Sequence, residues 1–482
     1  MSNLPHHGVE IDLSNLIKSY DVRGIVGVDL TEEIATAIGA AFAEEIVLPD
    51  GETHVAIGHD MRDTGPGLVA AVAAGLTARG VNVINIGLCS TDGLYHASGV
   101  LDIPGVMVTA SHNPAEYNGM KLCRSRARAV GENTGLSDVR SRAAVLLAEG
   151  ADGLGNGAGA GEVTHREMIG DYGTFLRGLV PLDGIRPLRV VVDAANAMAG
   201  YTVPAVLGTE AGLPQLPLEI IPLYFELDGS FPNHEPNPLD EENLRDLQAA
   251  VREHGADIGL AFDGDADRCF VVDERGDIVA ASAITCLVGL REAARDDAPI
   301  VIHNLISSRA VPEMLTAAGA TPVRSRVGHS FIKSDMAAHN AVFGGEHSAH
   351  FYFRDFFFAD SGMLAAMHVL AALGGDTNNP QTRPLSELLA PYTPYAASGE
   401  INTTVTDAAA ATARVVAALS DDGCVIDELD GVTIDHWGSE PRWWANVRSS
   451  NTEPLLRLNV EAADRAVMEE IRDRALAIIR EV

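Results

Sequence analysis

The sequence predicts an α/β protein with three similar mixed-sheet domains followed by a smaller C-terminal α+β domain. The chain has 482 residues, which is more than a single hydrophobic core accommodates. Strand-like and helix-like apolar patterns alternate along most of its length. Three successive units of about 110 residues each place a polar loop after a late apolar strand, which indicates structural repetition.

The first unit shows the alternation that leads from one strand to the next through a helix. Residues 54–58, 81–86 and 105–108 have extended patterns, and residues 66–79 have a helical one. This order favours a mixed or mostly parallel sheet. The glycine-rich tract 150–161 predicts a linker, so we expect the first domain to cover residues 1–160.

The second and third units repeat this order, and we expect them to form domains 161–278 and 279–392. In the second unit the predicted helices are 165–179, one near Gly200 and 240–254, and the predicted strands are 188–193 and 257–262. In the third unit the predicted helices are 283–295 and 307–318, and the predicted strands are 299–302, 321–327 and 341–343.

The last part of the chain has a different composition. Residues 388–398 are rich in proline and lose periodicity, which predicts a hinge. We expect a C-terminal α+β domain at residues 393–482. Its predicted strands are 401–405, 432–435 and 444–447, and its predicted helices are 408–419 and 464–480.

Net charge and targeting signals exclude several function classes. The chain has 67 acidic and 34 basic residues, a net charge of -33, which disfavours nucleic acid and anionic membranes as partners. A small anionic substrate can still bind, because local arginines, histidines, helix N-termini and metal ions decide that binding. The N-terminus lacks a secretory pattern, and the apolar stretch 363–373 is too short to cross a bilayer. The five cysteines show no CxxC spacing, and we expect reduced thiols and a cytoplasmic location.

A serine loop is the first stretch that points to chemistry. Thr109-Ala110-Ser111-His112-Asn113-Pro114 follows the predicted strand 105–108 directly. Ser111 on such a loop can act as a nucleophile or carry a phosphoryl group, and the alternative is an ordinary turn. Lys121, a few residues further on, can reach back to the serine or remain a solvated lysine.

Three carboxylates follow the predicted strand 257–262 at two-residue steps. Asp263, Asp265 and Asp267 can converge only around a cation, because their mutual repulsion is otherwise unfavourable. An EF-hand is an alternative, but Arg268 stands where that loop needs glycine and both flanks are strand-like. Solvated turn acids are a second alternative. The open set of oxygen ligands favours Mg²⁺ completed by a phosphate oxygen.

Two further polar stretches suit a phosphorylated sugar. Glu346 and Ser348, interleaved with His347 and His350, supply closely spaced partners for adjacent hydroxyls, unless they form a surface turn. Residues 448–452 combine an arginine with hydroxyls, which suits a phosphate dianion or, alternatively, a helix N-cap. His329 begins a predicted helix, and we consider both an acid–base and a structural role for it.

In this order and spacing, these four stretches closely resemble the α-D-phosphohexomutase superfamily, and Tyr20-Asp21-Val22-Arg23-Gly24 resembles its N-terminal signature. The resemblance implies four domains around a central cleft and a phosphoserine at Ser111. It implies that Ser111, Asp263, Asp265 and Asp267 hold one Mg²⁺ per chain. It further implies substrate contacts by Tyr20, Arg23, Glu346, Ser348, Arg448, Ser450, Asn451 and Thr452.

The activity that the resemblance implies is interconversion of mannose 6-phosphate and mannose 1-phosphate, an isomerase reaction. The stretch from Gly345 to Asp355 resembles the phosphomannomutase version of this loop. A phosphoserine and a hexose 1,6-bisphosphate intermediate, which also acts as activator, would carry the phosphoryl group. Lys121 and His329 are the candidate proton carriers, and Arg268 would offset charge on the transferring group.

The residues also allow alternatives to a phosphomannomutase. They are a phosphoglucomutase of sole or dual specificity, a phosphatase, and a phosphosugar-binding protein without turnover. Some members of the superfamily carry a lysine in the loop that corresponds to residues 303–309, where this chain has none, and Arg309 is the candidate to replace it.

Overall fold

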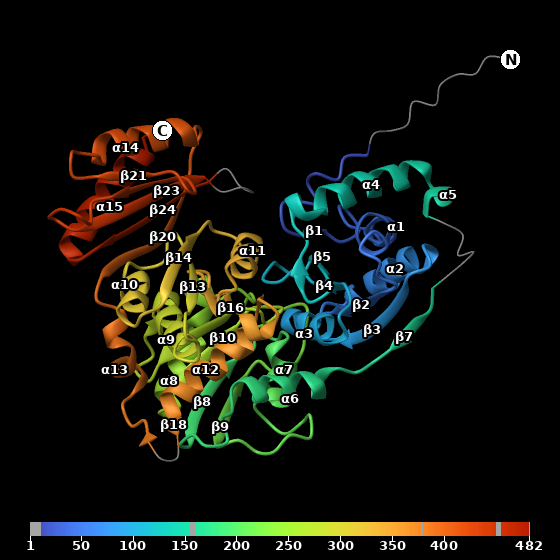
Figure 1. Ribbon diagram of the computed structural model, residues 1–482, viewed down its shortest axis with the longest axis horizontal. Helices are drawn as coiled ribbons and strands as arrows, with labels where there is room; N and C mark the ends of the chain where they lie inside the picture. The colour runs from blue at the N-terminus through green and yellow to red at the C-terminus, as the bar shows by residue number, and fades with distance from the viewer. Residues whose placement is uncertain (1–10, 155–160, 377–378, 450–454, 482) are drawn as a thin grey trace. The chain divides into compact units, whose positions relative to one another are not determined.

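The computed structural model shown in Figure 1 describes residues 11–154, 161–376, 379–449 and 455–481. Its internal contacts divide the chain into two units. The first contains Met1–Val279 and Ser348–Leu385, and the second contains Ala280–His347 and Ser386–Val482. The segment 348–385, which the sequence places late in the third predicted domain, therefore packs with the first unit.

The first sheet is mixed, as predicted. Its strand order is β1 (Val22–Ile25), β5 (Tyr117–Arg124), β4 (Gly105–Val108), β2 (His54–His59), β3 (Asn82–Leu88) and β7 (Val163–His165), with β6 (Arg128–Ala129) beside β5. Strands β4, β2, β3 and β7 run parallel to one another, whereas β5 is antiparallel to both β4 and β1. The strand β5 was not predicted, because its residues do not alternate between polar and apolar.

Helices cover both faces of this sheet. Val55 and Ile57 of β2 share a core with one group of helices, whereas Ala56 between them shares a core with α3 (Thr91–Leu101). This alternation is the two-residue period of a strand that is buried on both faces. The first group comprises α1 (Glu32–Phe42), which continues as the π-helix Ala43–Val47, together with α2 (Gly65–Ala78) and α4 (Leu136–Glu149).

The second sheet repeats this arrangement. Its order is β12 (Ile278–Val279), β11 (Cys269–Asp273), β10 (Ile258–Phe262), β8 (Leu188–Asp193) and β9 (Leu218–Leu223). Every residue of β10 is buried, as expected for a central strand, and α8 (Arg245–His254) packs on one face through Leu247 and Val251. The same unit contains the 3₁₀ turn Glu241–Leu244 and the helices α6 (Ile169–Leu179), α7 (Ala199–Val206) and α12 (Gly362–Gly374).

The segment 348–385 is fastened into the first unit by a buried carboxyl group. Ser361 Oγ and Tyr172 OH donate to Asp92 Oδ2 over 2.6 and 2.7 Å, so one side chain joins α3, α6 and the start of α12. Burial raises the pKa of Asp92 to about 6. The segment also carries the hairpin β16 (Phe351–Phe353) and β17 (Ala359–Asp360) with the 3₁₀ turn Arg354–Phe356, and the pair β18 (Gly375–Asp376) and β19 (Asn379–Pro380).

In the second unit, β13 (Ile300–Asn304) lies between two parallel neighbours, β14 (Thr321–Ser325) and β15 (Phe343–Gly345). The helices that pack on these strands are α9 (Ala281–Ala293), α10 (Ala310–Ala317) and α11 (His329–His339). This part follows the βα alternation predicted from the sequence.

The C-terminal domain has an antiparallel sheet with helices on one face. The strand order is β20 (Ala396–Thr404), β24 (Leu455–Ala462), β23 (Trp443–Ser449), β22 (Val432–Asp435) and β21 (Val425–Asp427). Helices α14 (Ala408–Leu419) and α15 (Arg465–Ile479) share a core with Trp443, Ala445 and Val447 of β23. Arg448 therefore belongs to the opposite face of the sheet.

The predicted fold class is confirmed, whereas the predicted ends of some helices and strands are wrong. Within the predicted linker 150–161, Ala151–Leu154 forms a helix, α5, and residues 155–160 lie outside the described residues. The helix predicted at 165–179 begins at Ile169, because Val163–His165 pairs with β3 as a strand. The predicted hinge 388–398 includes the end of α13 (Leu385–Leu389), the 3₁₀ turn Ala390–Tyr392 and the start of β20.

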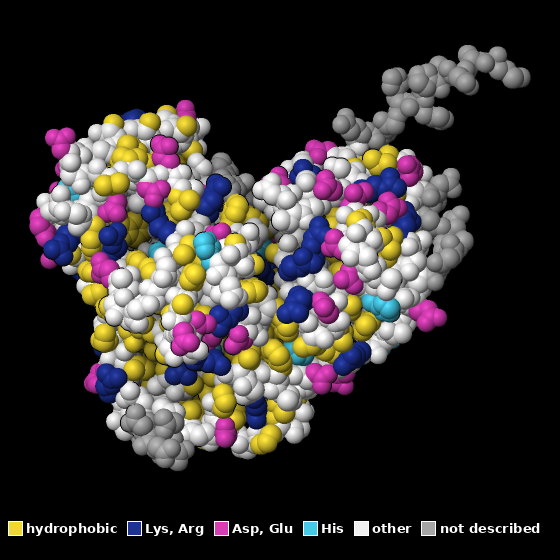
Figure 2. All heavy atoms as spheres, viewed as in Figure 1, with side chains coloured by type: hydrophobic (Ala, Val, Ile, Leu, Met, Phe, Trp, Pro, Cys, Tyr) yellow, Lys and Arg dark blue, Asp and Glu magenta, His cyan; other side chains and the backbone are white. Residues whose placement is uncertain are grey.

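The distribution of surface charge and the lengths of the helices can be compared with what nucleic-acid and membrane partners require. On the face drawn in Figure 2, acidic and basic side chains are interspersed rather than segregated. In the described part of the chain, every helix falls short of the length and apolar character that crossing a bilayer requires.

Candidate active site

The serine loop begins where β4 ends and holds Ser111 in a strained conformation. Ser111 has a φ of 49°, in the left-handed region that non-glycine residues rarely adopt. Its backbone N–H donates to Thr109 Oγ1 over 2.9 Å, and Thr109 Oγ1 donates to Asp60 Oδ2 over 2.7 Å. A backbone that hydrogen bonds hold in an unfavourable conformation is typical of functional sites.

Arg62 holds the same loop from beneath. Its guanidinium donates to the carbonyl oxygens of Ser111 (3.0 Å), Asn113 (2.7 Å), Pro114 (2.8 Å) and Tyr117 (2.9 Å). Asp60 accepts from Arg62 Nε over 3.3 Å, and both side chains are buried. Burial lowers the pKa of Arg62 and raises that of Asp60, while each charge opposes the shift of the other. Neither Asp60 nor Arg62 stands in a recognisable sequence motif, so this pair was not predicted.

The acidic loop begins where β10 ends, and its three carboxylates converge as predicted. One oxygen each of Asp263, Asp265 and Asp267 lies within 4.8 Å of the others, and all three residues are buried. Ser111 Oγ donates to Asp263 Oδ2 over 3.0 Å. A Cβ on Gly264 would lie 2.2 Å from the carbonyl oxygen of Ser111, so only glycine allows the two loops to approach this closely.

Lys121 lies on β5 and neutralises part of this cluster. Its Nζ is 2.6 Å from Asp265 Oδ2 and 2.5 Å from Asp267 Oδ2, and its side chain is only 12% exposed. Burial alone lowers the pKa of Lys121, but the two carboxylates overcome this effect and raise it well above its ordinary value. The alternative of a solvated lysine is therefore wrong.

Arg268 pairs with Asp263 and reaches the residue after Ser111. Its Nη2 lies 2.7 Å from Asp263 Oδ2 and 2.6 Å from His112 Nδ1. Burial and the Arg268 charge keep the pKa of His112 well below its ordinary value. A neutral His112 can therefore accept this hydrogen bond at Nδ1, and Arg268 joins the serine loop to the acidic loop.

The donor set fits a hard divalent cation. Asp265 Oδ1 and Asp267 Oδ1 are buried and have no hydrogen-bond partner among the described residues. Burial raises the pKa of Asp263 to about 8, whereas Lys121 and its hydrogen bond hold that of Asp265 well below the usual range despite burial. Buried, unsatisfied carboxylate oxygens are the ligands that Mg²⁺ accepts, and the Ser111 hydroxyl is placed to join them.

Other predicted residues lie beside these loops in the first unit. Arg23 Nη1 donates to Asn113 Oδ1 of the serine loop over 2.6 Å, and Arg23 also pairs with Asp21. Tyr20 immediately precedes this pair, ahead of β1. Ser348 Oγ lies 3.0 Å from His350 Nδ1, and His350 Nε2 lies 3.6 Å from Asp267 Oδ1. The residues 348–350 thus adjoin the acidic loop.

The remaining predicted residues belong to the second unit. Glu346 is buried after β15, and its Oε1 accepts from Gly328 N over 3.1 Å, directly before His329 at the start of α11. Arg448 Nη2 lies 2.7 Å from Glu400 Oε2. Ser450, Asn451 and Thr452 lie outside the described residues.

Arg309 is the candidate to replace the lysine that some members of the superfamily carry, and here it contacts other residues of the second unit. Its Nη1 is 3.2 Å from Asp435 Oδ2, and its guanidinium lies over the Trp437 ring at 5.7 Å. Thr91, the first residue of α3, also contacts the acidic loop, and sequence reasoning missed it. Its Oγ1 donates to Asp265 Oδ2 over 2.5 Å. A lone threonine at a helix start has no distinguishing pattern.

Family models match this chain in four consecutive parts. Their descriptions are phosphoglucomutase/phosphomannomutase α/β/α domain I (residues 14–141), domain II (175–276) and domain III (275–395), and the C-terminal domain (400–478). The chain belongs to the phosphoglucomutase/phosphomannomutase family, which confirms the resemblance carried by its motifs, and it is an enzyme of the isomerase class.

Individual relatives are similar to this chain over almost its whole length. The phosphohexose mutases of Xanthomonas campestris (strain B100) are 41% identical over 95% of this chain and 98% of theirs. Phosphomannomutase of Salmonella typhimurium is 40% identical over 95% of this chain and 97% of its own. A phosphoglucomutase/phosphomannomutase family protein of Burkholderia thailandensis has a similar solved structure, with 29% identity, 98% coverage of both chains and a TM-score of 0.84.

Proposed function

We propose that this enzyme interconverts mannose 6-phosphate and mannose 1-phosphate through a phosphoserine at Ser111 and a hexose 1,6-bisphosphate intermediate. The observation that carries the proposal is the Ser111 hydroxyl, held 3.0 Å from Asp263 in a cluster of three buried carboxylates. The relatives named phosphomannomutase support the choice of mannose, at 37 to 40% identity.

In the proposed reaction, the bond from phosphorus to Ser111 Oγ breaks while a bond forms to O1 or O6 of the hexose monophosphate. The attacking hydroxyl gives its proton to a base, for which His329 is our candidate. The second phosphate of the bisphosphate then returns to Ser111. Lys121, already a charged ammonium, is placed as a donor rather than an acceptor of protons.

Bound Mg²⁺, held by Asp263, Asp265, Asp267 and Ser111, would supply positive charge against the transferring phosphoryl group. Arg268 adds charge from the side of His112. Because these groups are already fixed by buried hydrogen bonds, little reorganisation is needed when charge develops during transfer.

We assign substrate binding to residues on three of the four proposed domains, 1–160, 279–392 and 393–482, whereas the proposed domain 161–278 would supply the metal ligands Asp263, Asp265 and Asp267. Glu346 and Ser348 would hold two neighbouring sugar hydroxyls. Arg448, Ser450, Asn451 and Thr452 would bind the phosphate that is not being transferred, with Tyr20 and Arg23 as further contacts. Mannose and glucose share the hydroxyls that Glu346 would hold, so this residue would orient the sugar without selecting it.

A second candidate function is dual activity on glucose and mannose phosphates. It is favoured by the relatives named phosphohexose mutases, which are 41% identical to this chain. The two candidates share one site and differ only in how the C2 hydroxyl is treated.

Steady-state turnover on mannose 1-phosphate and glucose 1-phosphate, with and without the matching bisphosphate, tests both. We expect mutase activity that the bisphosphate stimulates, and a phosphoryl adduct on the intact protein that Ser111→Ala lacks. Ser141→Ala, an exposed serine on α4, is the matched control and should retain both. Comparable rates on the two sugars would establish dual activity, and binding without turnover would contradict both functions.

A further inference from the structure

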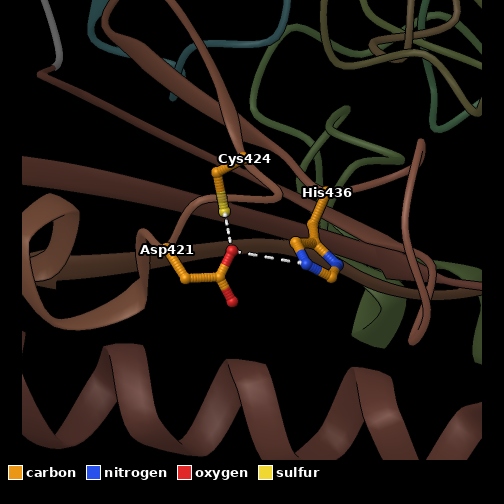
Figure 3. Close-up of side chains that lie close together, drawn as sticks. All are labelled: Asp421, Cys424 and His436. Atoms are coloured by element: carbon orange, nitrogen blue, oxygen red, sulfur yellow. Dashed lines mark hydrogen bonds and ion pairs between the residues drawn. The ribbon is translucent and has the colours of Figure 1, made fainter.

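The C-terminal domain brings together a thiol, an imidazole and a carboxylate away from the acidic cluster. Asp421 and Cys424 lie on the turn between α14 and β21, and His436 follows the last residue of β22. Figure 3 shows the Cys424 sulfur and the His436 ring both directed toward one oxygen of Asp421. The turn before β21 and the end of β22 therefore place three side chains close together, and all three are of types that bind metal ions.

The distances from Asp421 to the other two side chains match those between the ligands of a tetrahedral metal site. Cys424 Sγ lies 3.5 Å from Asp421 Oδ1, and His436 Nε2 lies 3.4 Å from the same oxygen. Zinc forms bonds of about 2.0 Å to nitrogen or oxygen and about 2.3 Å to sulfur, which places tetrahedral ligand atoms about 3.3 to 3.5 Å apart. All three ligand atoms lie within 4.8 Å of one another.

The backbone around His436 orients its ring as a metal ligand. His436 Nδ1 lies 2.7 Å from the carbonyl oxygen of Pro441 and donates to it, which directs Nε2 toward Asp421. The side chain is only 6% exposed, and the ring stacks on Trp443 with centroids 5.4 Å apart. A buried, stacked ring with a fixed Nδ1 hydrogen bond thus holds Nε2 in place as a candidate metal ligand.

Gly423 shapes the turn between Asp421 and Cys424 in two ways. Gly423 N donates to Asp421 Oδ1 over 2.8 Å, which fixes the carboxylate. A Cβ on Gly423 would lie 2.6 Å from His436 Nε2, so any other residue would fill the space beside the ring. Cys424 is the partly exposed member of the five cysteines, and Asp421 is exposed, so the site is open to solvent.

We propose that Cys424, His436 and Asp421 bind a zinc ion, with a water molecule or another small ligand completing the tetrahedron. Binding forms bonds from zinc to sulfur, nitrogen and oxygen, and the Cys424 proton passes to solvent. The ion would fasten the turn before β21 to the end of β22, and so stabilise the edge of the C-terminal sheet. Sulfur and nitrogen ligands distinguish this site from the acidic cluster, whose oxygens suit Mg²⁺.

Cobalt substitution in the full-length protein tests the proposal. With excess Mg²⁺ present to occupy the acidic cluster, Co²⁺ should give a thiolate-to-cobalt charge-transfer band, and Zn²⁺ should abolish it at one equivalent. Because all three tryptophans of the chain lie at positions 437, 443 and 444, intrinsic fluorescence should change in the same titration. Absence of the band would overturn the proposal, because it would show that no thiolate binds the metal.

Variants locate the bound ion. Cys424→Ser and His436→Gln should each weaken Zn²⁺ binding at least about tenfold and remove the zinc-dependent rise in thermal midpoint. The matched control is Asp422→Asn, a neighbouring exposed carboxylate outside the cluster, which should bind as the unmodified protein does. Zinc binding that survives Cys424→Ser but is lost in Asp265→Asn would assign the ion to the acidic cluster and overturn the proposal.

Discussion

Lys121 supplies the positive charge that the acidic cluster requires when it holds no metal ion. Three buried carboxylates within 4.8 Å of one another would otherwise repel, and the ammonium pairs with two of them. Removing one partner of a buried ion pair leaves an uncompensated charge, which is strongly destabilising.

We therefore predict that Lys121→Met lowers the stability of the metal-free protein by about 3 kcal/mol. Mg²⁺ should restore much of the loss, because it replaces the missing charge. The measurement is the thermal midpoint with EDTA and with Mg²⁺. Lys18→Met, at an exposed lysine, is the control. Equal midpoints for Lys121→Met and the unmodified protein in EDTA would contradict the prediction.

Arg62 is the residue that sets the shape of the serine loop. Four carbonyl oxygens accept from one guanidinium, and a lysine ammonium cannot reproduce this planar arrangement.

Arg62→Lys should leave the fold intact but misplace Ser111, and we expect kcat to fall by about a hundredfold. KM should change much less, since Arg62 donates to the loop backbone and not to a sugar. Steady-state kinetics on hexose 1-phosphates checks the prediction, and Arg166→Lys, at an exposed arginine, is the control. A loss confined to KM would show that Arg62 contacts substrate instead.

At the scale of helices, α1 and α2 pack so closely that two glycines replace side chains at the contact. A Cβ on Gly75 would lie 2.1 Å from the carbonyl oxygen of Thr36, and a Cβ on Gly39 would lie 2.3 Å from that of Val72. Both contacts are with backbone, which cannot rotate away as a side chain can.

Gly75→Ala should therefore destabilise the first unit by about 1 to 3 kcal/mol, despite the higher helix propensity of alanine. Gly178→Ala provides the comparison, because that glycine is exposed on α6 and a Cβ there meets nothing within 4 Å. It should be neutral or stabilising. Chemical denaturation of both variants measures the difference, and equal stabilities would show that the two helices can separate without loss.

Sequence patterns predicted some elements to the residue and missed others for physical reasons. The strands β4 and β8 and the helix α14 begin and end where predicted, because apolar runs with sharp polar boundaries define them. The convergence of Asp263, Asp265 and Asp267 was also predictable, because like charges at that spacing require a partner. The roles of Arg62 and Thr91 were not, since they depend on contacts between residues 49 or more positions apart.

At the scale of the whole molecule, buried histidines in both units make stability depend on pH. Burial lowers the pKa of His96, in the first unit, and of His303, in the second, to about 4. The unfolded chain has an ordinary histidine pKa of about 6.5 and so binds protons first as the pH falls. The stabilising contribution is therefore complete above pH 6.5 and is lost progressively down to pH 4.

Each of these histidines should contribute about 2 kcal/mol less at pH 5 than at pH 7.5. We predict that His96→Leu reduces the fall in thermal midpoint between these two pH values, and that His254→Leu, at an exposed histidine, does not. An unchanged pH dependence in His96→Leu would show that other groups govern acid unfolding.

The return of residues 348–385 to the first unit has a consequence for biosynthesis. The Asp92 side chain can form its hydrogen bond with Ser361 only after the ribosome has added 269 further residues. Residues 280–347, which belong to the second unit, are synthesised in between. Until then, the face of α3 that β17 covers and the face of β11 that α12 covers stay open to solvent. The nascent chain must therefore carry an incomplete first unit through most of translation, a period in which chaperones or neighbouring chains can meet its unfinished core.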